Sequence, residues 1–380
     1  MGSRKHGIGI STPIYDSREI NHLIRVLKDN RISMGSEVKE FEKRFSQYIG
    51  TKYGVAVNSG TSANMIALNV LLETGELKKG DEVIVPAATF ASVVSPIIHL
   101  GLIPVYVDVN STYYNIDPEE VKKAISKKTK AIIIVHSLGV AAEIDALLKI
   151  SKKHNLKIIE DCCEAHGAKY KKKKVGSFGD LATFSFFVSH NMTTGEGGMV
   201  LTNNSKYDKI ARSLREFGRY VGIKNRFSYY DKYLKNYDKK YIFERVGHNV
   251  RMTDLVASLG IEQLKKLDKM NATRREIAEY IKGEADLDPD RYNVYYGLMF
   301  ISPDRLKITK HLEKYGIETR PFFAGCLPDQ PAFRNSPKRI VGNLTTSRFA
   351  RDHIFFIGCH PGITKQDQDY IIKVFEKYEN

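Results

Sequence analysis

The sequence predicts an α/β protein built on a mostly parallel sheet, and three observations lead to that prediction. Short apolar runs alternate with amphipathic stretches over the first two thirds of the chain, as in strands joined by crossover helices. The runs are continuously hydrophobic, which is expected of strands covered on both faces. The chain has 380 residues, 42% of them hydrophobic and 27% charged, so it can bury a large core.

The elements follow in chain order. Strands are predicted at residues 55–57, 83–85, 105–107, 131–135 and 158–159, and helices at 63–72, 118–126 and 144–154. Two more apolar segments, 182–187 and 199–201, flank a glycine-rich turn and are expected to extend the sheet. The uncharged stretch 83–107 is long enough for a membrane span. Because Pro86, Pro96 and Pro104 interrupt it, a strand, a helix and a second strand are expected there.

The pattern changes after about Asn204. Residues 220–241 are rich in Tyr, Lys and Asn and are expected to form an exposed excursion. Beyond them the sequence predicts a long helix at 253–281, a turn at 286–290, a strand near 294–301, and helices at 303–315 and 365–378. We therefore expect a large unit over residues 1–250 and a smaller α+β unit over residues 251–380.

The net charge and the cysteine content of the chain restrict which ligands and which cellular compartment are expected. The net charge of +15 favours an anionic ligand, and the basic residues are spread along the chain. A phosphorylated small molecule is therefore expected in preference to nucleic acid, whose binding sites concentrate their positive charge. Four cysteines are too few for a secreted disulfide framework, and the N-terminus has no apolar signal segment. These features predict a cytoplasmic protein with no membrane anchor.

Three segments carry candidate chemistry. Residues 58–64, Asn-Ser-Gly-Thr-Ser-Ala-Asn, follow a predicted strand and open a helix, so they could form a phosphate cup or an ordinary capped turn. Asp161 ends a predicted strand, where a carboxylate could hold a protonated ring nitrogen or cap a helix. His190 stands shortly before Gly195, Gly197 and Gly198, and it is either catalytic or structural.

Five motifs together make a more specific resemblance. In order they are Ser-Gly-Thr-Ser-Ala-Asn, Glu-Asp-Cys-Cys-Glu-Ala-His-Gly-Ala, Gly-Asp-Leu-Ala-Thr-Phe-Ser-Phe, Thr-Gly-Glu-Gly-Gly and Gly-His-Asn-Val-Arg-Met-Thr-Asp. From about residue 20 onward the chain resembles the nucleotide-sugar aminotransferases, a family of fold-type-I pyridoxal phosphate enzymes. The resemblance implies a large seven-stranded-type sheet domain with an N-terminal arm, a smaller C-terminal domain that includes the long connecting helix, and a homodimer with shared active sites.

The resemblance also assigns roles to individual residues. It implies that Asp161 pairs with the pyridine nitrogen, that Phe90 covers one face of the ring, and that Glu164 lies near the ring 3-oxygen. Asn249 is expected to reach the phosphate of the partner subunit. The remaining phosphate ligands that it implies are Gly60, Thr61, Ser62 and Ser185.

One position departs from the family pattern. Aminotransferases of this family carry a lysine where this chain has His190, and no lysine lies between Lys174 and Lys206. An imidazole can move protons near neutral pH, but it cannot link covalently to the cofactor as the lysine does. The covalent anchor is therefore expected to be lost and proton transfer to be kept.

The exchange resembles a subgroup, the nucleotide-sugar 3-dehydratases. Glu164, where aminotransferases usually carry Gln, and the segments 319–325, 330–333 and 359–365 also resemble this subgroup. Some of its members carry an iron–sulphur cluster, which needs four convergent cysteines. Cys162 and Cys163 are adjacent while Cys326 and Cys359 are far apart in sequence, so the cluster-free type of the colitose pathway is the better match, and no metal is expected.

The resemblance implies that pyridoxal phosphate takes an amino group from L-glutamate to give pyridoxamine phosphate. The enzyme would then remove the C3 hydroxyl of a nucleotide-linked 4-keto-6-deoxyhexose, with His190 moving the proton. Candidate ligands for the glutamate carboxylate or the sugar diphosphate are Arg219, Arg251 and Arg320, each of which could instead form a structural ion pair. The nucleotide remains open and could be GDP, CDP or another. The alternatives are an aminotransferase whose lysine has been changed to histidine and a non-catalytic pyridoxal-binding regulator.

Overall fold

The computed structural model describes residues 7–30, 32–219, 236–238, 241–283 and 288–379. A sheet of eight strands forms its centre, in the order β1-β9-β8-β5-β4-β2-β3-β13. Only β9 runs against its neighbours, and the pairs from β8 to β13 are all parallel. The strands are β1 (Tyr53–Val57), β2 (Glu82–Pro86), β3 (Ile103–Val107), β4 (Thr129–Val135), β5 (Lys157–Asp161), β8 (Leu181–Ser185), β9 (Gly198–Thr202) and β13 (Arg339–Ile340).

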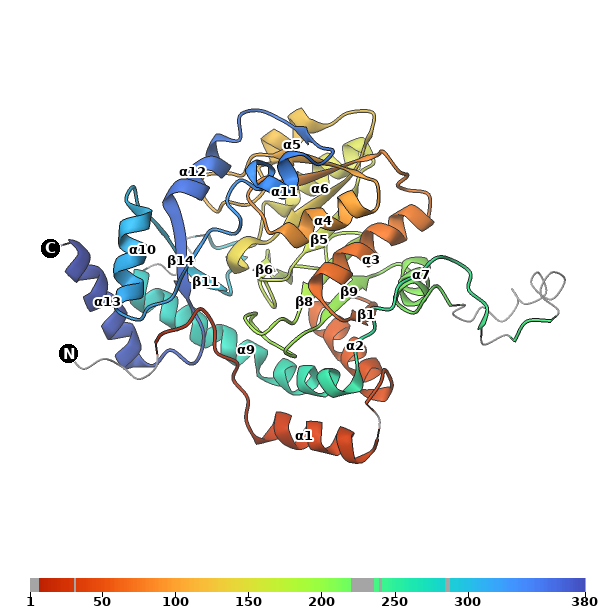
Figure 1. The fold of residues 1–380 in the computed structure, drawn as a ribbon, viewed down its shortest axis with the longest axis horizontal. Helices are drawn as coiled ribbons and strands as arrows, with labels where there is room; N and C mark the ends of the chain where they lie inside the picture. Colours follow the sequence, from red (N-terminus) through yellow and green to blue (C-terminus); the bar gives the residue numbers. More distant parts are fainter. Residues whose placement is uncertain (1–6, 31, 220–235, 239–240, 284–287, 380) are drawn as a thin grey trace.

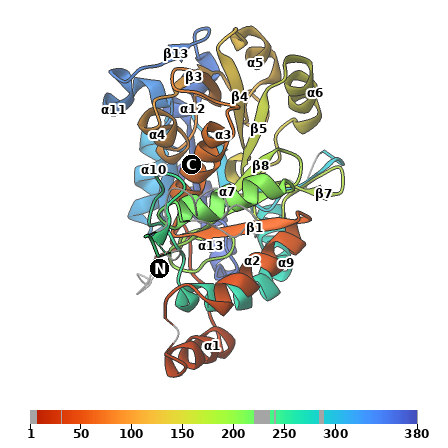
Figure 2. The same ribbon diagram turned by 90° about the vertical axis from the view of Figure 1, so that its right-hand side faces the viewer.

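Helices cover both faces of this sheet, which is why its strands are continuously apolar (Figure 2). One face packs against α3 (Gly60–Glu73), α4 (Ala91–His99) and α7 (Ser205–Arg215). The other face packs against α5 (Pro118–Ala124) and α6 (Ile144–His154), and further along against α2 (Ser36–Ile49) and the long helix α9 (Asp254–Lys282). The two apolar layers fix the sheet between them.

A second, three-stranded antiparallel sheet lies in the C-terminal part, in the order β11-β14-β12. Its strands are β11 (Gly297–Ile301), β12 (Thr319–Pro321) and β14 (Ile354–Gly358), accompanied by α10 (Arg305–Lys314), α12 (Thr345–His353) and α13 (Lys365–Glu379). The N-terminal segment joins this sheet, because Ile8 bridges Ile317 in parallel. The first described residues and helix α13 therefore both lie beside the C-terminal sheet (Figure 1).

Short elements complete the fold. They are the strands β6 (Lys169–Tyr170), β7 (Lys173–Lys174) and β10 (Arg291–Tyr292), the 3-10 helices η1 (Ser137–Gly139) and η3 (Leu327–Asp329), and the helix α11 (Pro331–Arg334). None of the helices in the described ranges has the length and apolarity needed to cross a bilayer.

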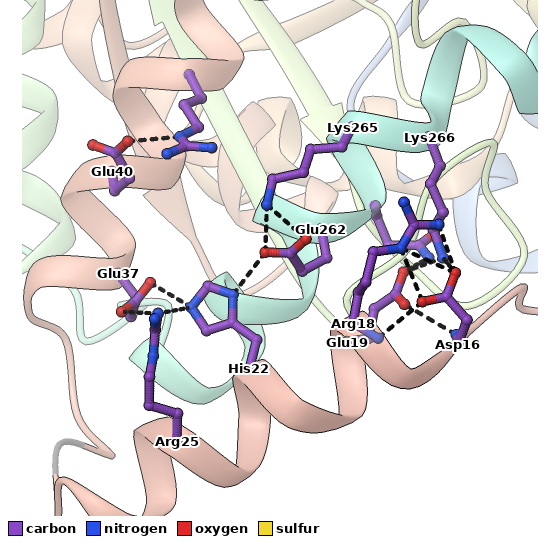
Figure 3. A network of polar contacts seen from close by, with 12 residues as sticks. Asp16, Arg18, Glu19, His22, Arg25, Glu37, Glu40, Glu262, Lys265 and Lys266 are labelled. Atoms are coloured by element: carbon purple, nitrogen blue, oxygen red, sulfur yellow. Dashed lines mark hydrogen bonds and ion pairs between the residues drawn. The ribbon is translucent and has the colours of Figure 1, made fainter.

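Helix α1 (Ser17–Lys28) lies outermost, beneath α2 and α9 (Figures 1 and 2). Its inward side carries Val26 and several polar groups: the buried Glu19 carboxylate pairs with Lys266, and Gln263 Nε2 donates to Glu19 Oε1 at 2.7 Å. His22 lies between Glu37 of α2, at 2.9 Å, and Glu262 of α9, at 3.0 Å (Figure 3). These polar contacts fix which side of α1 faces the body.

The α/β class and the mostly parallel sheet predicted from the sequence are confirmed. The stretch 83–107 forms β2, α4 and β3, and the long helix runs from Asp254 to Lys282. The predicted strand near 294–301 is shorter, because only residues 297–301 pair with β14. Most of the expected excursion at 220–241 and part of the turn at 286–290 lie outside the described residues, and the division at residue 250 stays a prediction.

Candidate active site

A cavity of about 700 Å³ opens at the carboxyl ends of the parallel strands. The turn after β1, the end of β5 and the end of β8 converge there because parallel strands end at one edge of a sheet. The C-terminal sheet supplies the opposite wall through Tyr296 and Arg320. Of the predicted site residues, those lining the cavity are Gly60, Thr61, Phe90, Asp161, Glu164, Ser185, His190 and Arg320.

The turn from β1 into α3 forms one wall. Ser59 caps the helix, accepting a hydrogen bond from Ser62 N at 3.1 Å, so the free N–H groups of the first turn lie beside the cavity. A Cβ atom at Gly60 would lie 2.6 Å from Ser185 Cβ, so only glycine lets this turn approach β8 so closely. The helix N-terminus and the hydroxyls of Thr61 and Ser185 make an anion-binding wall.

The Asp161 carboxylate is buried at the floor of the cavity. Its Oδ2 accepts from Asn64 Nδ2 at 2.8 Å, and its Oδ1 accepts from Cys163 N at 3.1 Å. Asn64 is itself held by Thr183, whose hydroxyl donates to Asn64 Oδ1 at 2.7 Å. The carboxylate is thus fixed from α3 and β8, and it can pair with a protonated nitrogen in the cavity.

Glu164 lies in the cavity wall, and its Oε2 accepts from Leu138 N at 2.8 Å. Burial raises the pKa of this carboxyl to about 8, and the negative charge of Asp161 adds to the effect. The carboxyl is therefore mostly protonated at neutral pH. It can donate a hydrogen bond, as a glutamine amide would.

His190 is half-buried in the wall, between Tyr296 and Phe187, with ring centroids 5.5 and 6.3 Å away. Burial lowers the pKa of the imidazole to about 3, and the positive charge of Arg274 contributes. The ring is neutral at pH 7 and can accept a proton. None of the described lining residues is a lysine.

Four predicted site residues do not line this cavity. Ser62 donates its hydroxyl to Asn58 Oδ1 at 2.7 Å. The other three lie together after α7: Arg219 is 3.3 Å from Glu216 Oε1, Arg251 is 3.8 Å from the same atom, and Arg251 Nε donates to Asn249 Oδ1 at 3.2 Å. The two guanidinium groups also lie over the ring of one phenylalanine, Phe217.

Sequence reasoning missed several lining or supporting residues. Asn64 belongs to the first quoted motif, but nothing in the sequence indicates that its side-chain amide would bond to Asp161. Ser189 and Tyr296 line the cavity with their hydroxyl oxygens 2.8 Å apart, although 107 residues separate them in the chain. Only the folded chain brings these two together.

His136, Glu160 and Cys162 lie close enough to suggest a metal site. Glu160, however, accepts hydrogen bonds from the backbone of Gly176, Phe178 and Gly179 at 2.7–2.8 Å, and Nδ1 of His136 accepts from Ala142 N at 3.1 Å. Because these ligand atoms are already engaged, the cluster is explained as a buried structural network.

Comparisons with known proteins agree with this geometry. Residues 13–376 match the model of the DegT/DnrJ/EryC1/StrS aminotransferase family. The lipopolysaccharide biosynthesis protein RfbH of Salmonella typhimurium is 36% identical over 97% of this chain and 91% of its own length. A GDP-4-keto-6-deoxy-D-mannose 3-dehydratase of Yersinia pseudotuberculosis is 32% identical, covering 92% of this chain and 93% of its own.

A GDP-perosamine synthase of Caulobacter vibrioides is 34% identical, over 83% of this chain and 84% of its own. Among solved structures, the E. coli GDP-4-keto-6-deoxy-D-mannose 3-dehydratase with bound hydrated PLP superposes with a TM-score of 0.88. It is 29% identical over 97% of this chain and 99% of that one. The chain has the fold-type-I aminotransferase fold that the sequence motifs implied.

Proposed function

The chain belongs to the DegT/DnrJ/EryC1/StrS aminotransferase family, and on that premise we propose that it is a pyridoxal phosphate-dependent 3-dehydratase of nucleotide sugars. Its substrate would be a nucleotide-linked 4-keto-6-deoxyhexose, and L-glutamate would be the amino donor. The products are a 4-keto-3,6-dideoxy sugar nucleotide, 2-oxoglutarate and ammonia. The observation that carries the proposal is a neutral imidazole, His190, in a cavity with no lysine among its described lining residues.

The residues of the cavity fit this cofactor. The N-terminus of α3 with Thr61 and Ser185 suits its phosphate, and Gly60, where a Cβ atom would lie 2.6 Å from Ser185 Cβ, lets the turn and Ser185 approach closely enough to contact one anion. The buried Asp161 carboxylate suits a protonated pyridine nitrogen. When bound, the cofactor supplies a carbonyl or amine that joins reversibly to amino acid or ketone, and a ring that accepts an electron pair.

The chain's own residues then direct the reaction. Asp161 keeps a proton on the ring nitrogen, and Glu164, which carries a proton at neutral pH, donates to the ring 3-oxygen. With the cofactor bound, His190 would be the residue that moves the proton between its exocyclic carbon and the hydroxyl that leaves C3 as water. Glutamate is the reductant, since its α-carbon is oxidised to the ketone of 2-oxoglutarate while C3 of the sugar is reduced.

An aminotransferase is the alternative, because the family also contains GDP-perosamine synthases, relatives of this chain. That reaction would leave the amino group on C4 of the sugar and keep the hydroxyl group on C3. The two outcomes separate by mass. With pyridoxal phosphate, L-glutamate and a panel of 4-keto-6-deoxy sugar nucleotides, we expect a product that has lost one oxygen atom, together with free ammonia. An aminated sugar as the main product would contradict the proposal.

The variant His190→Lys gives the sharpest comparison. A lysine there can attach the cofactor covalently, so C3 deoxygenation should fall by at least about a hundredfold and borohydride should fix the cofactor to the peptide. The exposed His154 on α6 provides the control, and His154→Lys should behave as the wild type. If glutamate does not convert the absorbance of the aldehyde cofactor to that of its amine, the protein is a non-catalytic pyridoxal-binding regulator instead.

We also propose that the enzyme acts as a homodimer. Among the described lining residues Arg320 is the only Lys or Arg, and it pairs with Glu318. A sugar diphosphate needs more positive charge than that. Arg219 and Arg251 lie outside this cavity, and a second copy could present them to it.

Helix α1 supports the same proposal. Glu19 and His22 of α1 face the body (Figure 3). On the opposite side, Ile20, Ile24 and Leu27 have 54%, 43% and 48% of their surface exposed. This i, i+4, i+7 spacing forms the kind of stripe that a helix normally buries. Sedimentation should show a dimer for the wild type and a weakened dimer for Ile24→Glu. Leu306 on α10, 64% exposed, supplies the control variant Leu306→Glu. A monomeric wild type would contradict the dimer.

A further inference from the structure

Among the described residues, none forms a hydrogen bond that orients the imidazole of His190. Its Nδ1 atom is buried and has no partner among the described residues. A histidine that moves a proton usually relies on such a bond to hold its ring and tautomer. Something else must therefore keep the ring directed at the cavity.

The neighbours of His190 in the chain are held instead. The Ser189 hydroxyl lies 2.8 Å from the hydroxyl of Tyr296, and Asn191 Nδ2 donates to Val294 O at 3.0 Å. The residues on both sides of the imidazole are thus bonded to one short segment, residues 294–296. In addition, the ring of Tyr296 packs against the imidazole, with centroids 5.5 Å apart.

That segment is itself fixed to the large sheet unit. Val294 N donates to Gly139 O at 3.1 Å and Tyr296 N donates to Leu138 O at 3.0 Å. Behind the ring of Tyr296 lies Phe356 of β14, with centroids 5.9 Å apart, and only 8% of Tyr296 is exposed. The tyrosine is therefore a rigid support on which the loop carrying His190 rests.

We propose that Tyr296 is the positioning residue of His190, acting through its hydroxyl on Ser189 and its ring against the imidazole. This inference rests on the proposed function, in which His190 moves the proton. Burial raises the pKa of the Tyr296 phenol to about 12, so the hydroxyl keeps its proton, and the bond to Ser189, throughout the physiological pH range. Tyr296→Phe removes that bond and keeps the ring.

The test separates two half-reactions, the conversion of the aldehyde cofactor to its amine by glutamate and the deoxygenation of the sugar. His190 moves the proton in both. Tyr296→Phe should therefore slow both by the same factor, about tenfold for one hydrogen bond, with the KM values for glutamate and sugar unchanged. Ser189→Ala should have the same effect, and the double variant should be no slower than either single one.

Tyr106→Phe is the matched control. Tyr106 is a buried tyrosine of β3, outside the lining of the cavity, whose hydroxyl has no partner among the described residues. Its loss should leave both rates at the wild-type value. Thermal unfolding of the three single variants, the double variant and the wild type checks that each protein is folded. If Tyr296→Phe does not fold, Ser189→Ala carries the test of the same hydrogen bond.

A second readout does not depend on activity. Acylation of His190 by diethyl pyrocarbonate, followed on its peptide by mass spectrometry in the cofactor-free protein, should accelerate several-fold in Tyr296→Phe and Ser189→Ala but not in Tyr106→Phe. Unchanged acylation and unchanged rates would overturn the inference. So would a raised KM for the sugar with a normal glutamate half-reaction, because Tyr296 would then be a sugar contact. A wild type without either half-reaction contradicts the proposed function, and the acylation rates then decide on Tyr296 alone.

Discussion

Replacing Glu164 with glutamine should make the cofactor-free protein more stable, and increasingly so as the pH rises. The pKa of this carboxyl is raised from 4.5 to about 8 in the folded protein, mainly by burial. Between these two values the unfolded chain has released the proton and the folded chain still holds it. The ionisation of Glu164 therefore costs the folded protein no stability below about pH 4.5, and it lowers the free energy of unfolding progressively as the pH rises towards 8.

The size of the effect follows from the same two values. Each tenfold change in proton affinity is worth about 1.4 kcal/mol, so the carboxyl costs up to about 5 kcal/mol once the pH exceeds both pKa values. Between pH 5 and pH 8 the cost should grow by up to about 3.5 kcal/mol. Glutamine has no such cost, and its carbonyl oxygen can still accept from Leu138 N, the contact that Glu164 makes at 2.8 Å.

Urea unfolding at a series of pH values from 5 to 9 measures the difference in the free energy of unfolding between Glu164→Gln and the wild type. The exposed Glu119 at the start of α5 supplies the control, and Glu119→Gln should show no comparable trend. A difference that stays constant with pH, or that shrinks as the pH rises, would refute the assignment of a protonated carboxyl at this position.

Other predictions concern the cavity floor and the turn at α3. Asp161→Asn should reduce the rates of both half-reactions at least about a hundredfold, because the ring nitrogen loses its anionic partner. Asn64→Ala should reduce these rates less, since it removes only a hydrogen bond to Asp161. Stopped-flow absorbance measures both rates, and equal effects of the two variants would contradict this order. Gly60→Ala should lower the free energy of unfolding by about 1–3 kcal/mol and weaken cofactor binding, since the added Cβ would lie 2.6 Å from Ser185 Cβ. The double variant with Ser185→Gly should recover the stability, measured by urea unfolding, though not the affinity.

The sequence was informative where local pattern and burial coincide. The continuous apolar runs at residues 83–85, 105–107 and 131–135 form strands because helices cover both faces of the sheet. It was uninformative for α1, where Ile20, Ile24 and Leu27 are exposed while Glu19 and Val26 are buried. Periodicity shows which residues share one side of a helix, but it does not show which side packs against the rest of the same chain.

The site divides in the same way. Asp161 was predicted from its place at the end of a strand, Gly60 from the turn between a strand and a helix, and Ser185 from the family resemblance; the structure brings all three to one edge, where the parallel strands end. The outcome differs for Arg219, Arg251 and Asn249, which lie together beside Glu216 and do not line the cavity of their own chain. The motifs identify which residues are candidates for the site, but the path of the chain after α7 decides which cavity these residues can reach.

The sequence by itself determined the α/β class, the family and the histidine in place of a lysine, because these depend on residue types and their order. Only the tertiary structure decided that Glu164 holds a proton and that Tyr296 supports His190. Both depend on what surrounds a side chain: desolvation and a contact between residues 107 positions apart arise only once the two sheets have packed together.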